Sequence, residues 1–170
     1  MAFNSGVFKS HRFLWRLVFL LFVGPASADI QLPQNADVCV SWAAGDLKAA
    51  LRSVGIELAS ADVVVICPQA SLGEQSFSID ITKGRATIRA GDSVGAMYGL
   101  QELAEQIVVA GKSSTWDQLA GRLYNTTQHP CLEVRAENAF IHLHPFMLND
   151  LEMWRSYIDM LARNRFNLLD

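Results

Sequence analysis

Two histidines separated by one residue are the first pattern in this sequence that could perform chemistry. His142 and His144 form an H-x-H pair, and on a β-strand both imidazoles would point to the same side. Such a pair could hold a divalent metal ion. A catalytic zinc ion needs three protein ligands, however, and the pattern offers no third one. The alternative is two ordinary histidines that enter a loop at Pro145, and we predict no metal site.

Arg135 is the predicted substrate-binding residue. It follows Pro130 at the head of an expected strand. A guanidinium in that place can hold a sugar hydroxyl or a carboxylate through two parallel hydrogen bonds. The alternative is an ion pair at the strand edge with one of its two acidic neighbours, Glu133 or Glu137.

Acidic side chains could also supply the pair of carboxyl groups that glycosidic chemistry uses. The candidates are Asp80, Glu102, Glu105, Glu133 and Glu137. We expect Asp80 and the two acids of the expected helix to face water, and Glu133 and Glu137 flank Arg135. None stands out as a proton donor, so we predict no catalytic residue within this chain.

The three cysteines are Cys39, Cys67 and Cys131. An odd number leaves at least one free thiol in an exported chain. Cys39 and Cys67 lie in apolar runs, which favours buried free thiols, and a bridge between the two on neighbouring strands is the alternative. No Cys/His spacing typical of zinc occurs.

Two further short motifs carry little weight. Gly111-Lys112-Ser113 resembles the end of a phosphate-binding loop, but the first glycine of that motif and its preceding strand are missing. We therefore expect no nucleotide and no other cofactor. Asn125-Thr126-Thr127 is a glycosylation sequon, which has meaning only in a eukaryotic secretory pathway.

The first 28 residues have the layout of a secretory signal peptide. A basic start precedes the apolar run of residues 17–23, and Ala26-Ser27-Ala28 is a small-x-small cleavage site. We predict cleavage after Ala28, a secreted or periplasmic location and no membrane contact of the mature chain. The net charge of −3 shows no basic excess, so we expect no nucleic-acid partner.

The elements that must position these residues begin with a small domain over residues 29–110. Residues 85–107 read as a strand, a turn and an amphipathic helix, because apolar residues alternate and then recur at helical spacing. Gly95 and Gly99 share one face of that helix, which predicts close approach to a sheet. Upstream we expect a hairpin over residues 75–90, a buried strand at 61–67, a helix at 47–54 and a first strand at 37–42. The predicted fold class is α/β (α+β), with the order β-α-β-β-β-α.

The composition changes after residue 110. Residues 111–130 are polar and are expected to link two domains. From Cys131 onward we expect a strand, then a strong helix capped by Asn149 or Asp150, a C-cap at Asn164 and a second strand from Phe166. This is the β-α-β opening of a larger parallel sheet.

The small domain and this opening together resemble exported glycoside hydrolases, among them the β-N-acetylhexosaminidases and the α-glucuronidases. In their N-terminal domain a helix of the form G-x-x-Y-G-L-x-x-L follows a hairpin, as it does here at Gly95, Tyr98, Gly99, Leu100 and Leu103. The tail from Tyr157 to Leu169 resembles the first helix of a (β/α)8 barrel that runs into the second strand.

The resemblance implies an incomplete TIM barrel over residues 131–170 and a carbohydrate substrate for the full-length protein. The family's catalytic residues come from later strands, so we expect this chain alone to be inactive. Ala136 stands after Arg135 where hexosaminidases have glycine, and a glucuronidase-like or an uncharacterised relative fits equally well. The alternatives are a non-catalytic carbohydrate-binding or structural module and a metal-dependent amidohydrolase-like barrel that uses His142 and His144.

Overall fold

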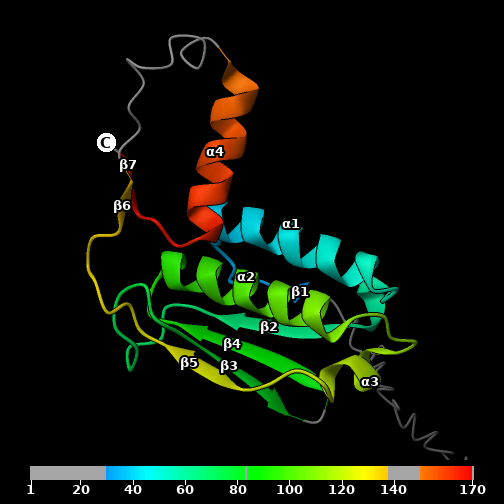
Figure 1. Cartoon of the computed structure of the whole chain (residues 1–170). Helices are drawn as coiled ribbons and strands as arrows, with labels where there is room; N and C mark the ends of the chain where they lie inside the picture. Colours follow the sequence, from blue (N-terminus) through cyan, green and yellow to red (C-terminus); the bar gives the residue numbers. More distant parts are fainter. Residues whose placement is uncertain (1–29, 83, 138–149, 170) are drawn as a thin grey trace, which may run out of the picture.

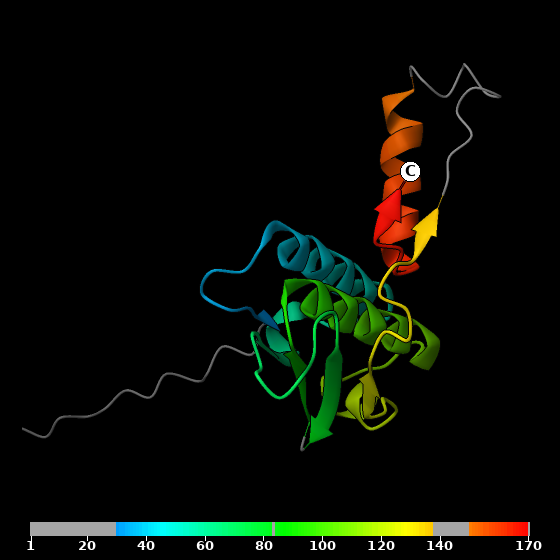
Figure 2. The same cartoon turned by 90° about the vertical axis from the view of Figure 1, so that its left-hand side faces the viewer.

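The computed structural model describes residues 30–82, 84–137 and 150–169, and these form two units (Figure 1). The first, the sheet unit, is a five-stranded sheet covered on one face by two long helices. The second, the β-α-β unit, stands at one end of the first (Figure 2). The elements in chain order are β1 (Ile30–Gln31), α1 (Val38–Ser53), the 3-10 helix η1 (Leu58–Ser60), β2 (Asp62–Ile66), β3 (Phe77–Thr82), β4 (Arg85–Ala90), α2 (Ser93–Ala110), α3 (Trp116–Ala120), β5 (Thr126–Gln128), β6 (Ala136–Glu137), α4 (Leu151–Arg163) and β7 (Leu168–Leu169).

The sheet is mixed, with the strand order β1-β2-β4-β3-β5. β1, β2 and β4 run parallel, whereas β3 pairs antiparallel with both β4 and β5. The predicted hairpin is therefore confirmed, with Ile79 opposite Ile88. Both of these side chains are fully buried under the helices, while Asp80 and Arg89 form an ion pair on the open face. This alternation is typical of a sheet with one face on the core and one in water.

The expected first strand at residues 37–42 is wrong. Those residues begin α1, and the first strand of the sheet is β1, a part of the chain that the sequence pattern left without structure. The alternation of Val38 and Val40 indicated a strand, but Val38 is 86% exposed while Val40 is buried. Val40, Ala43, Ala44, Leu47 and Leu51 are all buried, and their spacing is that of one helix face.

Residues 111–130, which were expected to link two domains, form secondary structure of their own. They contain α3, with Trp116 and Leu119 buried against the core, and β5, which pairs with β3 through Phe77 and Gln128. This stretch therefore belongs to the sheet unit. The division between domains near residues 128–130 stays a prediction.

The predicted β-α-β arrangement is confirmed for the described part of residues 131–170. β6 and β7 pair in parallel, with Ala136 opposite Leu168, and α4 lies between them in the chain. The side chain of Asp150 caps α4 by accepting a hydrogen bond of 2.9 Å from the N–H of Met153, and Asn164 is the C-cap as expected. The β6–β7 pair forms its own sheet.

Several predictions fall outside the described residues. These are the signal peptide of residues 1–28, the capping role of Asn149 and the positions of His142 and His144. Within the described part of the chain, every helix is too short or too polar to cross a membrane.

The close approach of α2 to the sheet is confirmed. A Cβ atom on Gly95 would lie 2.4 Å from the backbone oxygen of Ser76, and one on Gly99 would lie 2.6 Å from Cγ2 of Ile88. Real Cβ atoms do not come this close, so glycine is required at both positions. Asp92 fixes the start of the same helix, because its carboxylate accepts from the N–H of Gly95 at 2.7 Å and from that of Gln75 at 2.9 Å.

Gly95→Ala should lower the free energy of unfolding by about 1–3 kcal/mol, since the new methyl group overlaps backbone that has no room to move. The matched control is Gly45→Ala in α1, where a Cβ atom would meet nothing within 4 Å. That substitution should stabilise the chain by about 0.5–1 kcal/mol through helix propensity alone. Chemical denaturation followed by circular dichroism measures both, and equal effects of the two substitutions would contradict the packing described here.

Candidate functional site

A pocket of about 320 Å³ lies where the sheet unit meets the β-α-β unit. We call it the junction pocket. Side chains from both units line it, among them Gln75, Tyr98, Gln128, Arg135 and Arg165. It contains the one substrate-binding residue that the sequence predicted, Arg135.

The guanidinium of Arg135 is engaged by groups of the protein itself. Its Nε donates to the carbonyl oxygen of Arg165 at 2.6 Å, and its Nη1 donates to that of Leu132 at 2.6 Å. Its Nη2 donates to Oε1 of Gln75 at 2.5 Å and to the hydroxyl of Tyr98 at 3.3 Å. Four of the five N–H donors of a guanidinium are thus in use.

The expected alternative, an ion pair of Arg135 with Glu133 or Glu137, does not occur among the described contacts of Arg135. The carboxylate of Glu137 instead lies near Tyr157, whose pKa is raised first by desolvation and then by the charge of that carboxylate. These hydrogen bonds do not test whether Arg135 also binds a substrate, which stays a prediction.

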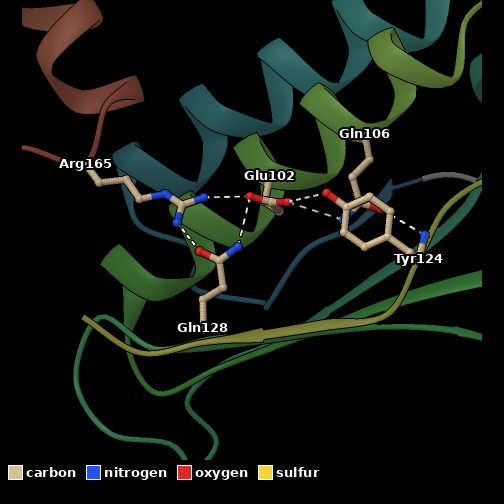
Figure 3. A network of polar contacts seen from close by, with 5 residues as sticks. All are labelled: Glu102, Gln106, Tyr124, Gln128 and Arg165. Atoms are coloured by element: carbon tan, nitrogen blue, oxygen red, sulfur yellow. Dashed lines mark hydrogen bonds and ion pairs between the residues drawn. The ribbon is translucent and has the colours of Figure 1, made fainter. Parts of the chain in front are cut away.

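Arg165 enters the junction pocket from the segment between α4 and β7. Its Nη2 lies 2.7 Å from Oε2 of Glu102, an ion pair, and its Nη1 donates to the amide oxygen of Gln128 (Figure 3). The guanidinium carbon lies 5.4 Å from the ring centre of Phe77 and 6.0 Å from that of Tyr98. These distances fit cation–π contact.

Glu102 is the centre of the polar network in Figure 3. Besides Arg165, its carboxylate accepts from Nε2 of Gln128 at 3.2 Å, from the hydroxyl of Tyr124 at 3.2 Å and from Nε2 of Gln106 at 3.4 Å. Desolvation raises the pKa of Tyr124, and the neighbouring charge of Glu102 raises it further. Four donors occupy the lone-pair sites of this carboxylate, so the protein itself holds the side chain in place.

The prediction that Glu102 faces water is therefore wrong. Glu102 is only 8% exposed. Gln128, Tyr124 and Arg165, which are distant from it in sequence, cover this face of α2. Glu105, one turn away, is exposed as expected.

The other candidate carboxylates do not pair with one another in the described contacts. Asp80 pairs with Arg89 on the open face of the sheet, and Glu137 lies near Tyr157 on α4. Metal ligands do not gather either, since no group of three His, Cys, Asp or Glu side chains forms among residues 30–82, 84–137 and 150–169.

Sequence reasoning missed the role of Arg165, for which one local signal exists. The residue after a helix C-cap often adopts a left-handed backbone, and glycine or asparagine is usual there. Arg165 follows the C-cap Asn164 and has a φ of 63°. An arginine thus stands where glycine or asparagine is usual.

Comparison with known proteins adds the context of this fold. No family model and no curated protein matches the sequence. Among solved structures, the chain is similar to a family GH138 enzyme that targets the pectin rhamnogalacturonan II, with a TM-score of 0.63 and 19% identity over 83% of this chain and 23% of that one. It is also similar to a family GH115 4-O-methyl-α-glucuronidase with specificity for decorated arabinogalactans, with a TM-score of 0.58 and 15% identity over 84% of this chain and 24% of that one.

The chain has a glycoside-hydrolase-like fold. It spans about a quarter of the length of the two structures that it matches.

The three cysteines are free thiols, with Cys39 and Cys67 half-buried and Cys131 exposed. Burial is the first cause that raises the pKa of Cys39, followed by the charge of Asp37. The pKa of Cys67 is raised by burial and then by the charge of Asp92. A raised pKa leaves less thiolate, the reactive form, at a given pH.

Alkylation by iodoacetamide at neutral to mildly alkaline pH should therefore modify Cys131 first, with Cys39 and Cys67 following more slowly. Peptide mass spectrometry over a time course measures the three rates. The same digest after unfolding in denaturant is the control, because the three rates should then converge. Equal rates in the folded chain would contradict the described burial.

Proposed function

We propose that this chain is the N-terminal part of an exported glycoside hydrolase that acts on an oligosaccharide or polysaccharide. The observation that carries the proposal is the order of its two units, a five-stranded α/β sheet followed by a parallel β-α-β unit. The match to two glycoside hydrolases extends over more than four-fifths of the chain.

The β-α-β unit supports a continuation into a (β/α)8 barrel. Parallel sheets are normally covered by helices and buried on both faces, and a pair of strands is marginally stable by itself. Here β6 and β7 have two residues each, and Leu168 and Leu169 are exposed. Leu151 and Ile158 of α4 are also exposed. Further strands and helices of a barrel would cover these apolar side chains.

In such a barrel the catalytic groups lie at the carboxyl ends of the strands. Arg135 and Asn167 directly precede β6 and β7, so they stand at the opposite end. We therefore assign the junction pocket to holding the two units together and place the sugar-cleaving carboxyl pair at later strand ends. No metal or organic cofactor enters this proposal.

For the substrate we favour a glucuronidase-like specificity. Ala136 follows Arg135 where the hexosaminidase pattern has glycine. One of the matched structures is an α-glucuronidase, and the other targets a pectin. The sugar that this proposal names for the full-length protein is accordingly an acidic one.

The test is to read the coding sequence beyond Asp170, express the complete product and assay it on chromogenic α-glucuronides and β-N-acetylhexosaminides. We expect hydrolysis of the glucuronide by the complete protein, none by the 170-residue chain, and a secreted form that begins at Asp29. Turnover by the 170-residue chain would refute the assignment of the chemistry to later strands.

Two outcomes of the same assay would point to the alternatives. Carbohydrate binding without any hydrolysis by the complete protein would indicate a non-catalytic module. Hydrolysis that is lost with a chelator and with His142→Ala and His144→Ala would indicate the metal-dependent barrel.

A further inference from the structure

We infer that Arg165 and Arg135 are positioning residues that fix where the two parallel strands begin relative to the sheet unit. We call their contacts in the junction pocket the junction latch. The identity of β6 and β7 as the first strands of a barrel rests on the proposed function. The test below does not use activity, so the two proposals can fail separately.

Backbone conformation is the first observation. Among the residues that the structure describes, only two that are not glycine have a left-handed φ: Gln75 at 55° and Arg165 at 63°. Both line the junction pocket, one from each unit. Side chains other than glycine are disfavoured in this region, and such conformations persist where the surroundings impose them. Their coincidence at one place indicates that the junction is constrained from both sides.

The second observation is a reciprocal pair of hydrogen bonds at the start of the two strands. The N–H of Arg135 donates to Oδ1 of Asn167 at 2.8 Å, and the N–H of Asn167 donates to the carbonyl oxygen of Arg135 at 2.9 Å. These residues directly precede β6 and β7. The pair therefore sets the register in which the strands begin.

The same two residues are tied to the sheet unit. Oε1 of Gln75 accepts from Nη2 of Arg135 at 2.5 Å and from Nδ2 of Asn167 at 3.4 Å. The N–H of Gln75 is in turn bound by Asp92, the cap of α2. Register at the start of β6 and β7 is thus coupled to the position of α2 through side chains.

Arg165 closes the latch by acting through both its side chain and its backbone. Its guanidinium pairs with Glu102, which α2 holds in a nearly buried place. Its carbonyl oxygen accepts from Nε of Arg135. The planar guanidinium reaches Gln128 and Glu102 through two separate nitrogens, whereas a lysine would offer one nitrogen at the end of a flexible stem.

Arg165→Gly is the decisive variant, because glycine suits the left-handed backbone and keeps the end of α4 intact while it removes the side chain. Residual dipolar couplings of the isotope-labelled chain measure the relative orientation of the two units. In the unaltered chain we expect one alignment tensor for α1, α2 and α4 together. In Arg165→Gly we expect α4 to need a tensor of its own, with unchanged helical shifts inside α4.

Arg165→Lys should rescue the common tensor only in part, and Glu102→Gln should weaken the coupling from the other side of the ion pair. The matched control is Arg155→Ala, which removes an exposed ion pair with Glu152 inside α4 and should keep one tensor. One common tensor in both Arg165→Gly and Glu102→Gln would overturn the inference. If Arg165→Gly does not fold, Glu102→Gln and Arg165→Lys decide in its place by the same measurement.

Discussion

The structure depends on how closely α2 lies against the sheet. Gly95 touches the backbone of Ser76 and Gly99 touches Ile88 and Phe77, so the helix sits deep enough to be surrounded by other elements. α1 packs beside it on the same face of the sheet (Figure 1). Its remaining side carries Tyr98 and Glu102, which hold Arg135 and Arg165. One helix thus links the core of the sheet unit to the place where the next unit begins.

Much of this fold follows from local sequence patterns, whereas the junction does not. The hairpin and α2 could be predicted because their apolar residues repeat with the period of the element. α1 was partly missed, since Val38 and Val40 alternate as a strand would although only Val40 is buried. β5 has no apolar pattern and forms because the edge of β3 is free to pair. The burial of Glu102 depends on Arg165, 63 residues away, and no local pattern encodes such a contact.

The polar groups of the junction are satisfied by one another. The two oxygens of Glu102 accept from four donors. Arg135 donates to Leu132, Gln75, Tyr98 and Arg165. Satisfied groups of this kind give a fixed geometry rather than reactivity. Contacts that hold the amino ends of two parallel strands leave the carboxyl ends available for chemistry, as in barrels of the kind proposed here.

The lengths of the two outermost strands of the five-stranded sheet affect how easily another chain could pair with its edges. β1 has two residues and β5 has three, whereas the three strands between them have five or six. An edge this short offers a passing chain few unpaired N–H and C=O groups to bind. Short edge strands of this kind give another chain little room to add a strand of its own.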